Sequence, residues 1–220
     1  MSATKIIWFA VLVVFGVVTA AGTEASAQQP SGVRVEGQVQ AGGGPLASST
    51  VTLWAASAGE PKQLAQTKSG SDGRFELRAA DTPGKDVVLY VVAKGGIATV
   101  KKGSGDNPTT ALLTVLGNKP PAKIIVNELT TVASTFTSAR FIKGEAISGN
   151  SLGLRIAAGN APSLVDPATG EWGKVLLDPL NSSMTTTLAK LDTLGSLISA
   201  YATVANDDWR ARFLKRQFAN

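Results

Sequence analysis

The sequence predicts a β-rich α+β fold, in which an antiparallel β-sandwich over residues 33–126 is followed by a mainly helical extension over residues 127–205. Up to residue 126, short segments alternate apolar and polar residues with a period of two and are separated by glycine-rich turns, which is typical of half-buried strands. After residue 126, apolar residues recur every three or four positions, as on one face of a helix. The chain contains no cysteine, so buried apolar surface must stabilise the fold in place of disulfide bonds.

The first 27 residues are predicted to be a cleaved signal peptide. A short basic start ends at Lys5, an apolar run follows over residues 6–21, and Ala25-Ser26-Ala27 matches the small-x-small pattern of a cleavage site. The run is about 16 residues long, whereas a membrane-spanning helix needs about 20, so we favour cleavage over a retained anchor. We therefore expect an exported protein, periplasmic or secreted, with a polar linker over residues 28–32.

The first strands follow this linker. Valines and Gly37 alternate with charged and amide residues over residues 33–40, which predicts a half-buried strand. A glycine-rich cluster at residues 41–45 then turns the chain, and a second alternating strand is expected over residues 50–55. Residues 63–68 form a weaker candidate strand, because they are mostly polar.

The remaining strands are predicted from one turn and three apolar segments. Asp72-Gly73 suits a tight hairpin, after which residues 74–78 alternate again. Residues 87–93 are apolar on both faces, so a central strand is expected there. We expect residues 112–116 and 123–126 to close the second sheet.

Three helices are expected in the extension. Asn127 is the predicted cap of the first helix, whose apolar stripe includes Phe136. Residues 144–179 are rich in glycine and proline, so we expect only one short helix there, at residues 151–158. Residues 181–183 are expected to cap a longer helix. Its apolar stripe consists of Met184, Leu188, Leu191, Leu194, Ile198 and Tyr201. The surface that covers this stripe is the first helix, the sandwich or a partner, and the sequence does not choose between them.

Part of the chain resembles a known family. The block VRVEGQVQAGGGPLASSTVTLWAA, followed by TKSGSDGRFEL and VVLYVVAKGG, is similar to the carboxypeptidase regulatory-like domain, a transthyretin-like β-sandwich of exported bacterial proteins. The resemblance covers about residues 31–100, and its specific motifs are residues 44–47 and 71–75. In that family these positions are turn and core residues, so the resemblance implies an accessory or binding module with no catalytic role.

The second half of the chain resembles another group. VNELTTVASTFTSARF, SGNSLGLRIAAGNAPSLVDPATGEWG and DPLNSSMTTTLAKLDTL look like the helical region that precedes NHL-type β-propellers in secreted bacterial proteins. In those proteins the chain continues into propeller blades, for which this sequence leaves no room. Two interpretations stay open, a short stand-alone protein or the truncated head of a lyase-like propeller enzyme.

Catalytic motifs are weak in this sequence. It contains no histidine, the usual general base and the commonest zinc ligand. Residues 149–153 have the G-x-S-x-G spacing of a nucleophilic serine, but without a histidine we interpret them as a loop or helix start. Asp72 with Asp81 or Asp86 lacks the D-x-D-x-D-G pattern of a calcium loop, so turn geometry is the preferred explanation for Asp72.

One acidic stretch keeps a catalytic alternative open. Asp166, Glu171 and Asp178 lie near Trp172, and paired carboxylates beside an aromatic ring are typical of sites that bind or cleave sugars. Asp166 and Asp178 each precede a proline, however, which is a common turn arrangement. We therefore favour loop structure, with a carbohydrate-binding or hydrolase fragment as the alternative.

The charge of the chain suggests few partners. The formal net charge is +5, which permits loose attraction to acidic polymers, and nucleic acid is not expected as the partner of an exported chain. The basic tail, residues 206–220, interleaves aromatic residues with cations. We prefer a helix end packed on its own domain over contact of this tail with a membrane.

The sequence thus predicts an exported, non-catalytic module that binds an envelope protein or a glycan. We expect no cofactor, no metal and no catalytic residues. Trp54, Trp172 and Glu171 are the expected contact residues, together with the unpaired edges of the strands.

Overall fold

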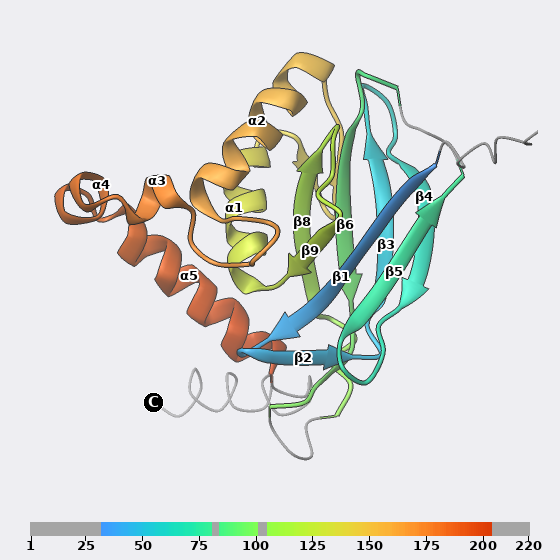
Figure 1. Cartoon of the computed structure of the whole chain (residues 1–220), viewed down its shortest axis with the longest axis horizontal. Coiled ribbons are helices and arrows are strands. Elements are labelled where there is room, and N and C mark those ends of the chain that lie inside the picture. The colour runs from blue at the N-terminus through green and yellow to red at the C-terminus, as the bar shows by residue number, and fades with distance from the viewer. Residues whose placement is uncertain (1–31, 81–83, 101–104, 204–220) are drawn as a thin grey trace, which may run out of the picture.

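The computed structural model describes residues 32–80, 84–100 and 105–203 (Figure 1). The predicted signal peptide, residues 28–31 of the linker and the basic tail lie outside the described residues. The strands are β1 (Val33–Ala41), β2 (Gly44–Ala47), β3 (Thr50–Ala56), β4 (Lys62–Lys68), β5 (Arg74–Ala79), β6 (Val88–Lys94), β7 (Ile97–Ala98), β8 (Ala111–Gly117), β9 (Lys123–Val126), β10 (Ile142–Lys143) and β11 (Ala146–Ile147). The helices are α1 (Glu128–Ser138), α2 (Ser151–Leu164), α3 (Lys174–Leu177), α4 (Pro179–Met184) and α5 (Thr187–Ala202). The prediction of a β-rich α+β fold with antiparallel sheets is confirmed.

Two larger sheets carry the fold. One has the order β5-β1-β2-β7, with β9 also paired to β1, and the other has the order β4-β3-β6-β8. β6 lies between β3 and β8, as predicted for a strand that is apolar on both faces. The expectation that residues 112–116 and 123–126 share a sheet is wrong, because β8 pairs with β6 whereas β9 pairs with β1. β9 also runs parallel to β1, an exception among otherwise antiparallel pairs.

The inner faces of these two sheets share the largest buried cluster. Val35 and Val39 of β1 pack in it with Leu53 of β3 and Val91 of β6. Strand alternation explains why Val35 and Val39 both point inward, because every second residue of β1 points to the same face. The period-two pattern in the sequence therefore predicted the inward residues of β1 and β3, but not those of β6, which is apolar on both faces.

Gly37 breaks the row of inward valines on β1 for a steric reason. It lies directly opposite Phe75 of β5, and a Cβ atom at Gly37 would lie 2.7 Å from Phe75 Cζ and 2.4 Å from the Ile124 carbonyl oxygen. The Phe75 ring thus occupies the space that a side chain at position 37 would need. Such cross-strand pairing of glycine with an aromatic ring is a known way to fill a gap in a sheet.

The Asp72-Gly73 turn does not form the predicted hairpin. Gly73 has a φ of 74°, as the dipeptide suggests, but β4 pairs with β3 and β5 pairs with β1, so the turn carries the chain from one sheet to the other. The buried Ser69 hydroxyl donates to the Leu46 carbonyl at 2.8 Å and accepts from the Ser49 N–H at 2.9 Å. These bonds link the start of the turn to the chain between β2 and β3, where the two sheets meet.

Helices cover the outer face of the β4-β3-β6-β8 sheet. Tyr90 and Val92 of β6 pack there with Leu154 and Ala158 of α2, and Figure 1 shows α1 and α2 on the side of β8. Burial raises the pKa of the Tyr90 phenol. β6 is therefore apolar on both sides because one face meets the other sheet and the opposite face meets helices.

Helix α1 also covers the free edge of β8. Thr131 Oγ1 accepts from the Leu113 N–H and Ser134 Oγ accepts from the Val115 N–H, both at 2.9 Å. Unpaired backbone donors at a sheet edge are costly when buried and otherwise invite pairing with another chain. Side-chain hydroxyls of a helix therefore replace a neighbouring strand here.

This arrangement corrects the predicted stripe of the first helix. Asn127 does cap α1, in a capping box with Thr130, as expected for this residue type. Phe136, however, is 62% exposed, while Thr130, Thr131 and Ser134 are buried. The helix turns its hydroxyl face to the strand edge, because that edge needs hydrogen-bond acceptors.

The other helices differ from prediction at their ends. α2 extends to Leu164, through Pro162, so the expectation that this region holds no long element is wrong. Residues 181–183 lie inside α4, whose cap is Asp178, and α5 starts after Thr186. Packing of Leu154 and Ala158 on the sheet stabilises α2, so the helix continues through a proline in its last turn.

The covered stripe of α5 includes a glycine that the apolar pattern missed. Leu191 and Gly195 are buried, whereas Leu194 is 47% exposed. A Cβ atom at Gly195 would lie 2.9 Å from Leu129 Cδ2 of α1, so glycine permits the two helices to approach closely. Both the first helix and the sheets cover α5, since Leu191 packs on Val132 while Ile198 also packs against the cluster between the sheets.

Candidate functional site

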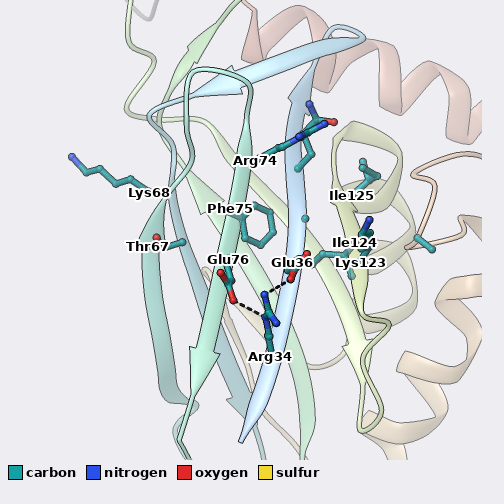
Figure 2. A pocket seen from close by; sticks show the side chains of 13 residues that line it. Arg34, Glu36, Thr67, Lys68, Arg74, Phe75, Glu76, Lys123, Ile124 and Ile125 are labelled. Carbon is teal, nitrogen blue, oxygen red and sulfur yellow. Dashed lines mark hydrogen bonds and ion pairs between the residues drawn. The ribbon is translucent and has the colours of Figure 1, made fainter.

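The outer face of the β5-β1-β9 region carries a hollow that no helix covers. Its volume is about 800 Å³, and charged side chains from all three strands line it, together with Gln38 of β1 and with Thr67 and Lys68 of β4 (Figure 2). This size lies in the range of ordinary ligand sites. Because charged side chains converge on this hollow, we treat it as the candidate binding site.

Strand alternation places the polar residues of the hollow. Arg34, Glu36 and Gln38 of β1 occupy the positions between the inward valines, so they point outward. Register then brings Glu36 opposite Glu76 of β5 and Lys123 of β9. A parallel and an antiparallel neighbour of the same strand thus supply the two sides of the hollow.

An ion-pair network occupies one end of the hollow. Arg34 contacts Glu36 and Glu76, in each case at 2.6 Å (Figure 2). Arg78 also contacts Glu76 at 2.6 Å. The hydrogen bond from Arg78, with a second one from Arg34, lowers the pKa of the Glu76 carboxyl. Both arginines bind Oε1 of Glu76, and no described residue donates to its Oε2. The network therefore favours the ionised form of Glu76, and one oxygen each of Glu36 and Glu76 is left to accept further hydrogen bonds.

Two cations of the hollow have little compensation. Arg74 lies 3.6 Å from Asp72, with its side chain 80% exposed, so that pair is weak. Lys123 has no carboxylate within ion-pair distance among the described residues. Lys68 also lines the hollow, but its side chain extends away from the sheet in Figure 2. The uncompensated positive charge of the hollow thus comes from Arg74 and Lys123.

The region after α2 provides one wall of the hollow. The Pro167 carbonyl accepts from the Ile125 N–H at 2.8 Å, and the Gly170 carbonyl accepts from the Asn127 side chain at 3.0 Å. Ala168, in the same turn, lines the hollow. A segment more than forty residues distant in sequence from β9 therefore pairs with the outer edge of that strand and borders the site.

The acidic stretch is placed by this turn. The Asp166 carbonyl accepts from the Gly170 N–H at 2.8 Å, and its carboxylate accepts from the Ala168 N–H at 2.8 Å. Asp178 Oδ1 accepts from the Leu180 N–H at 2.9 Å as the cap of α4. Both aspartates thus have turn or cap roles, in line with our preferred interpretation.

The predicted contact residues near Trp172 are only partly brought together. Trp172 is half-buried and packs beside Val132, Leu176 and Leu191. With Asp166 it lines a separate groove of about 500 Å³, which Glu171 and Asp178 do not line. Glu171 itself is exposed. A role for Trp172 and Glu171 in ligand contact stays a prediction.

Other predicted residues have structural surroundings. The Trp54 ring is half-buried and stacks on Tyr90, with ring centroids 6.4 Å apart and planes at 13°. Asp72 accepts from the Arg74 N–H within its turn, and Asp86 is exposed, while Asp81 lies outside the described residues. Ser151 is the first residue of α2, behind its cap Asn150. The helix-start interpretation of the G-x-S-x-G spacing is therefore confirmed.

Sequence reasoning missed the hollow for an identifiable reason. The alternating polar residues of β1 and β5 were visible, but they resemble any solvated strand face. The parallel pairing of β9 with β1, which brings Lys123 beside Glu36, has no local signal. The hollow depends on that pairing and on the turn at residues 166–171.

Searches for other kinds of site give few candidates. In the described part of the chain, no three His, Cys, Asp or Glu residues are grouped so that they could hold a metal ion. None of the described helices combines the length and the apolar character that crossing a membrane requires.

Comparison with known proteins gives no family. No family model and no curated protein sequence matches this chain. A solved structure that it partly resembles is a 9R-lipoxygenase from Cyanothece PCC8801, with 16% identity and a TM-score of 0.28. The similarity covers 43% of this chain and 16% of the lipoxygenase chain. Such a low TM-score supports no conclusion about fold or function.

Proposed function

We propose that this protein is an exported, non-catalytic binding module that attaches to another component of the cell envelope through the hollow on the β5-β1-β9 face. We take the two-sheet part to be a transthyretin-like β-sandwich of the carboxypeptidase regulatory-like kind. The sequence motifs at residues 44–47 and 71–75 support this assignment, together with the shared cluster between the sheets. The N-terminal segment supports export, because it has the three parts of a signal peptide.

The observation that carries the proposal is the contrast in cover between the two sheets. The helices bury the outer face of one sheet, while the outer face of the other keeps a hollow lined by charged side chains. A concave surface with convergent polar groups is the usual place for a ligand. The chain has no histidine or cysteine, so the residues of the hollow suit recognition better than acid–base or nucleophilic catalysis.

A capture experiment tests this function. The purified chain is immobilised and exposed to envelope extract at several salt concentrations, beside the double variant Arg74→Gln/Lys123→Gln. We expect a component that the native chain retains and the double variant loses, with retention falling as salt rises. A second double variant, Arg140→Gln/Lys190→Gln, removes the same charge at exposed positions that do not line the hollow and should retain the component. If the native chain captures nothing above background, the proposal fails.

A further inference from the structure

The hollow mixes cations with carboxylates, and this mixture restricts its ligand. Arg74 and Lys123 offer positive charge without a strong ion-pair partner, which favours a negatively charged group. Glu36 and Glu76 are half-buried or exposed acceptors on the same face, and they would repel a ligand that is densely anionic throughout. The ligand should therefore carry both anionic groups and hydrogen-bond donors.

The strand pairing argues against an extended peptide. β1 is paired with β5 on one side and with β9 on the other, so the central strand of the hollow has no free edge to which a peptide could add. Of the large apolar side chains that line it, Phe75 and Ile124 are buried and Ile125 is half-buried, so the surface of the hollow is more polar than apolar. Recognition must then come from polar side chains.

Sugar hydroxyls match the free acceptors of the hollow. Glu76 Oε2 and Glu36 Oε2 receive no hydrogen bond from a described residue, and hydroxyl groups are donors that a carboxylate accepts well. The Gln38 side chain is already engaged, because it donates to the Asp72 carbonyl at 2.7 Å and its amide oxygen accepts from the Gln40 side chain at 2.9 Å. Carboxylates of the same ligand would pair with Arg74 and Lys123.

We propose that the hollow binds an acidic polysaccharide, a glycan whose sugars carry carboxylates, through Arg74 and Lys123 for its charge and through Glu36 and Glu76 for its hydroxyls. This assignment rests on the proposed binding function and specifies its ligand. It differs from simple attraction between a basic protein and a polyanion, because it gives the two glutamates an attractive role.

The test is calorimetric titration of the purified chain with three probes of similar length. The probes are an oligogalacturonate, a neutral cello-oligosaccharide and an oligoglutamate peptide with the same charge as the oligogalacturonate. We expect the oligogalacturonate to bind and the other two to bind at least about tenfold more weakly. Arg74→Gln/Lys123→Gln should weaken oligogalacturonate binding by about tenfold or more, since charge-assisted hydrogen bonds are lost. Arg140→Gln/Lys190→Gln should change it by less than about twofold.

Glu76→Gln decides between recognition and plain electrostatics. If Glu76 accepts sugar hydroxyls, this variant weakens oligogalacturonate binding, although it removes a negative charge. If only the net charge matters, the same variant strengthens binding, and the inference is overturned. Equal binding of oligoglutamate, or equal loss in the Arg140→Gln/Lys190→Gln variant, also overturns it. A chain that captures an envelope component through the hollow but binds no oligogalacturonate would refute this ligand while leaving the proposed function intact. Unchanged thermal unfolding of every variant shows that folding is not the cause.

Discussion

The outer faces of the two sheets differ in what covers them. On β1 the outward residues are Arg34, Glu36 and Gln38, and they line an open hollow. On β6 the corresponding outward residues are Val88, Tyr90 and Val92, and α2 packs on them. The comparison teaches that the helices do not form an appendage to the sheets. They supply the second buried layer that a strand with two apolar faces requires.

The edges of the sheets differ in the same way. On the helical side, β8 is capped by hydroxyls of α1, and β9 is paired with the turn at residues 166–171. On the other side β4 is an edge strand with lysines at both ends, Lys62 and Lys68, and a register shift beside it. Charged residues and bulges discourage pairing of an edge with another chain. These features weigh against the β8, β9 and β4 edges as contact sites, and they favour the open face.

The largest expected effect is on the helix-covered face, where substitution of Leu154 should destabilise the packing of α2 on the sheet. This residue is 1% exposed and packs on Tyr90 and Val92, so Leu154→Ala should lower the free energy of unfolding by about 2–5 kcal/mol. Leu152, two residues earlier in the same helix, is 60% exposed, and Leu152→Ala should change it by less than about 0.5 kcal/mol. Urea unfolding followed by tryptophan fluorescence measures both. Equal losses would mean that α2 does not pack on the sheet through this face.

The next effect is expected at the β8 edge of the helix-covered sheet, where Ser134 accepts a backbone hydrogen bond. Ser134→Ala removes the acceptor of the Val115 N–H and leaves a buried donor unsatisfied, which should cost about 1–3 kcal/mol. The Val115 amide should also exchange its hydrogen faster. Thr135→Ala, at an exposed position of the same helix, is the matched control and should cost less than about 0.5 kcal/mol. Unchanged exchange at Val115 in Ser134→Ala would show that the hydroxyl does not protect the edge.

The smallest effect is expected on the open face, where charges meet solvent. The pKa of Glu76 is lowered in the folded protein by Arg78 and Arg34. Its ionised form therefore adds stability that is fully present above the ordinary glutamate pKa of about 4.3 and is lost as the pH falls through the lowered folded value. Glu76→Gln should accordingly flatten the decline in unfolding free energy between about pH 5 and pH 3.

The matched control for this pH effect is Glu60→Gln. Glu60 is exposed in the loop before β4, and no ion pair joins it to another described residue. Urea unfolding at several pH values gives the slopes of the native protein and both variants. An unchanged slope in Glu76→Gln would show that the ion-pair network does not persist in solution.

The two halves of the chain differed in how far the sequence predicted them. Strands β1, β3 and β5 followed from alternation, because their inward and outward residues differ in polarity, whereas β6 and β8 followed from apolar segments. The predicted apolar stripes of α1 and α5 were partly wrong, because Phe136 and Leu194 are exposed. In α1 the buried face is made of hydroxyl residues that satisfy a strand edge, and in α5 a glycine allows close contact with another helix. Apolar periodicity cannot detect either kind of contact, because neither uses a large apolar side chain.

By itself, the sequence determined the class of the fold, several of the strands that face a core and the Asn127 cap of α1, since these depend on neighbours one to four positions apart. Only the tertiary structure decided the parallel pairing of β9 with β1, the helical cover over β6 and the turn that borders the hollow. These contacts join residues far apart in the chain, and their stability comes from burial and backbone pairing that no local pattern encodes. The candidate site lies where they meet.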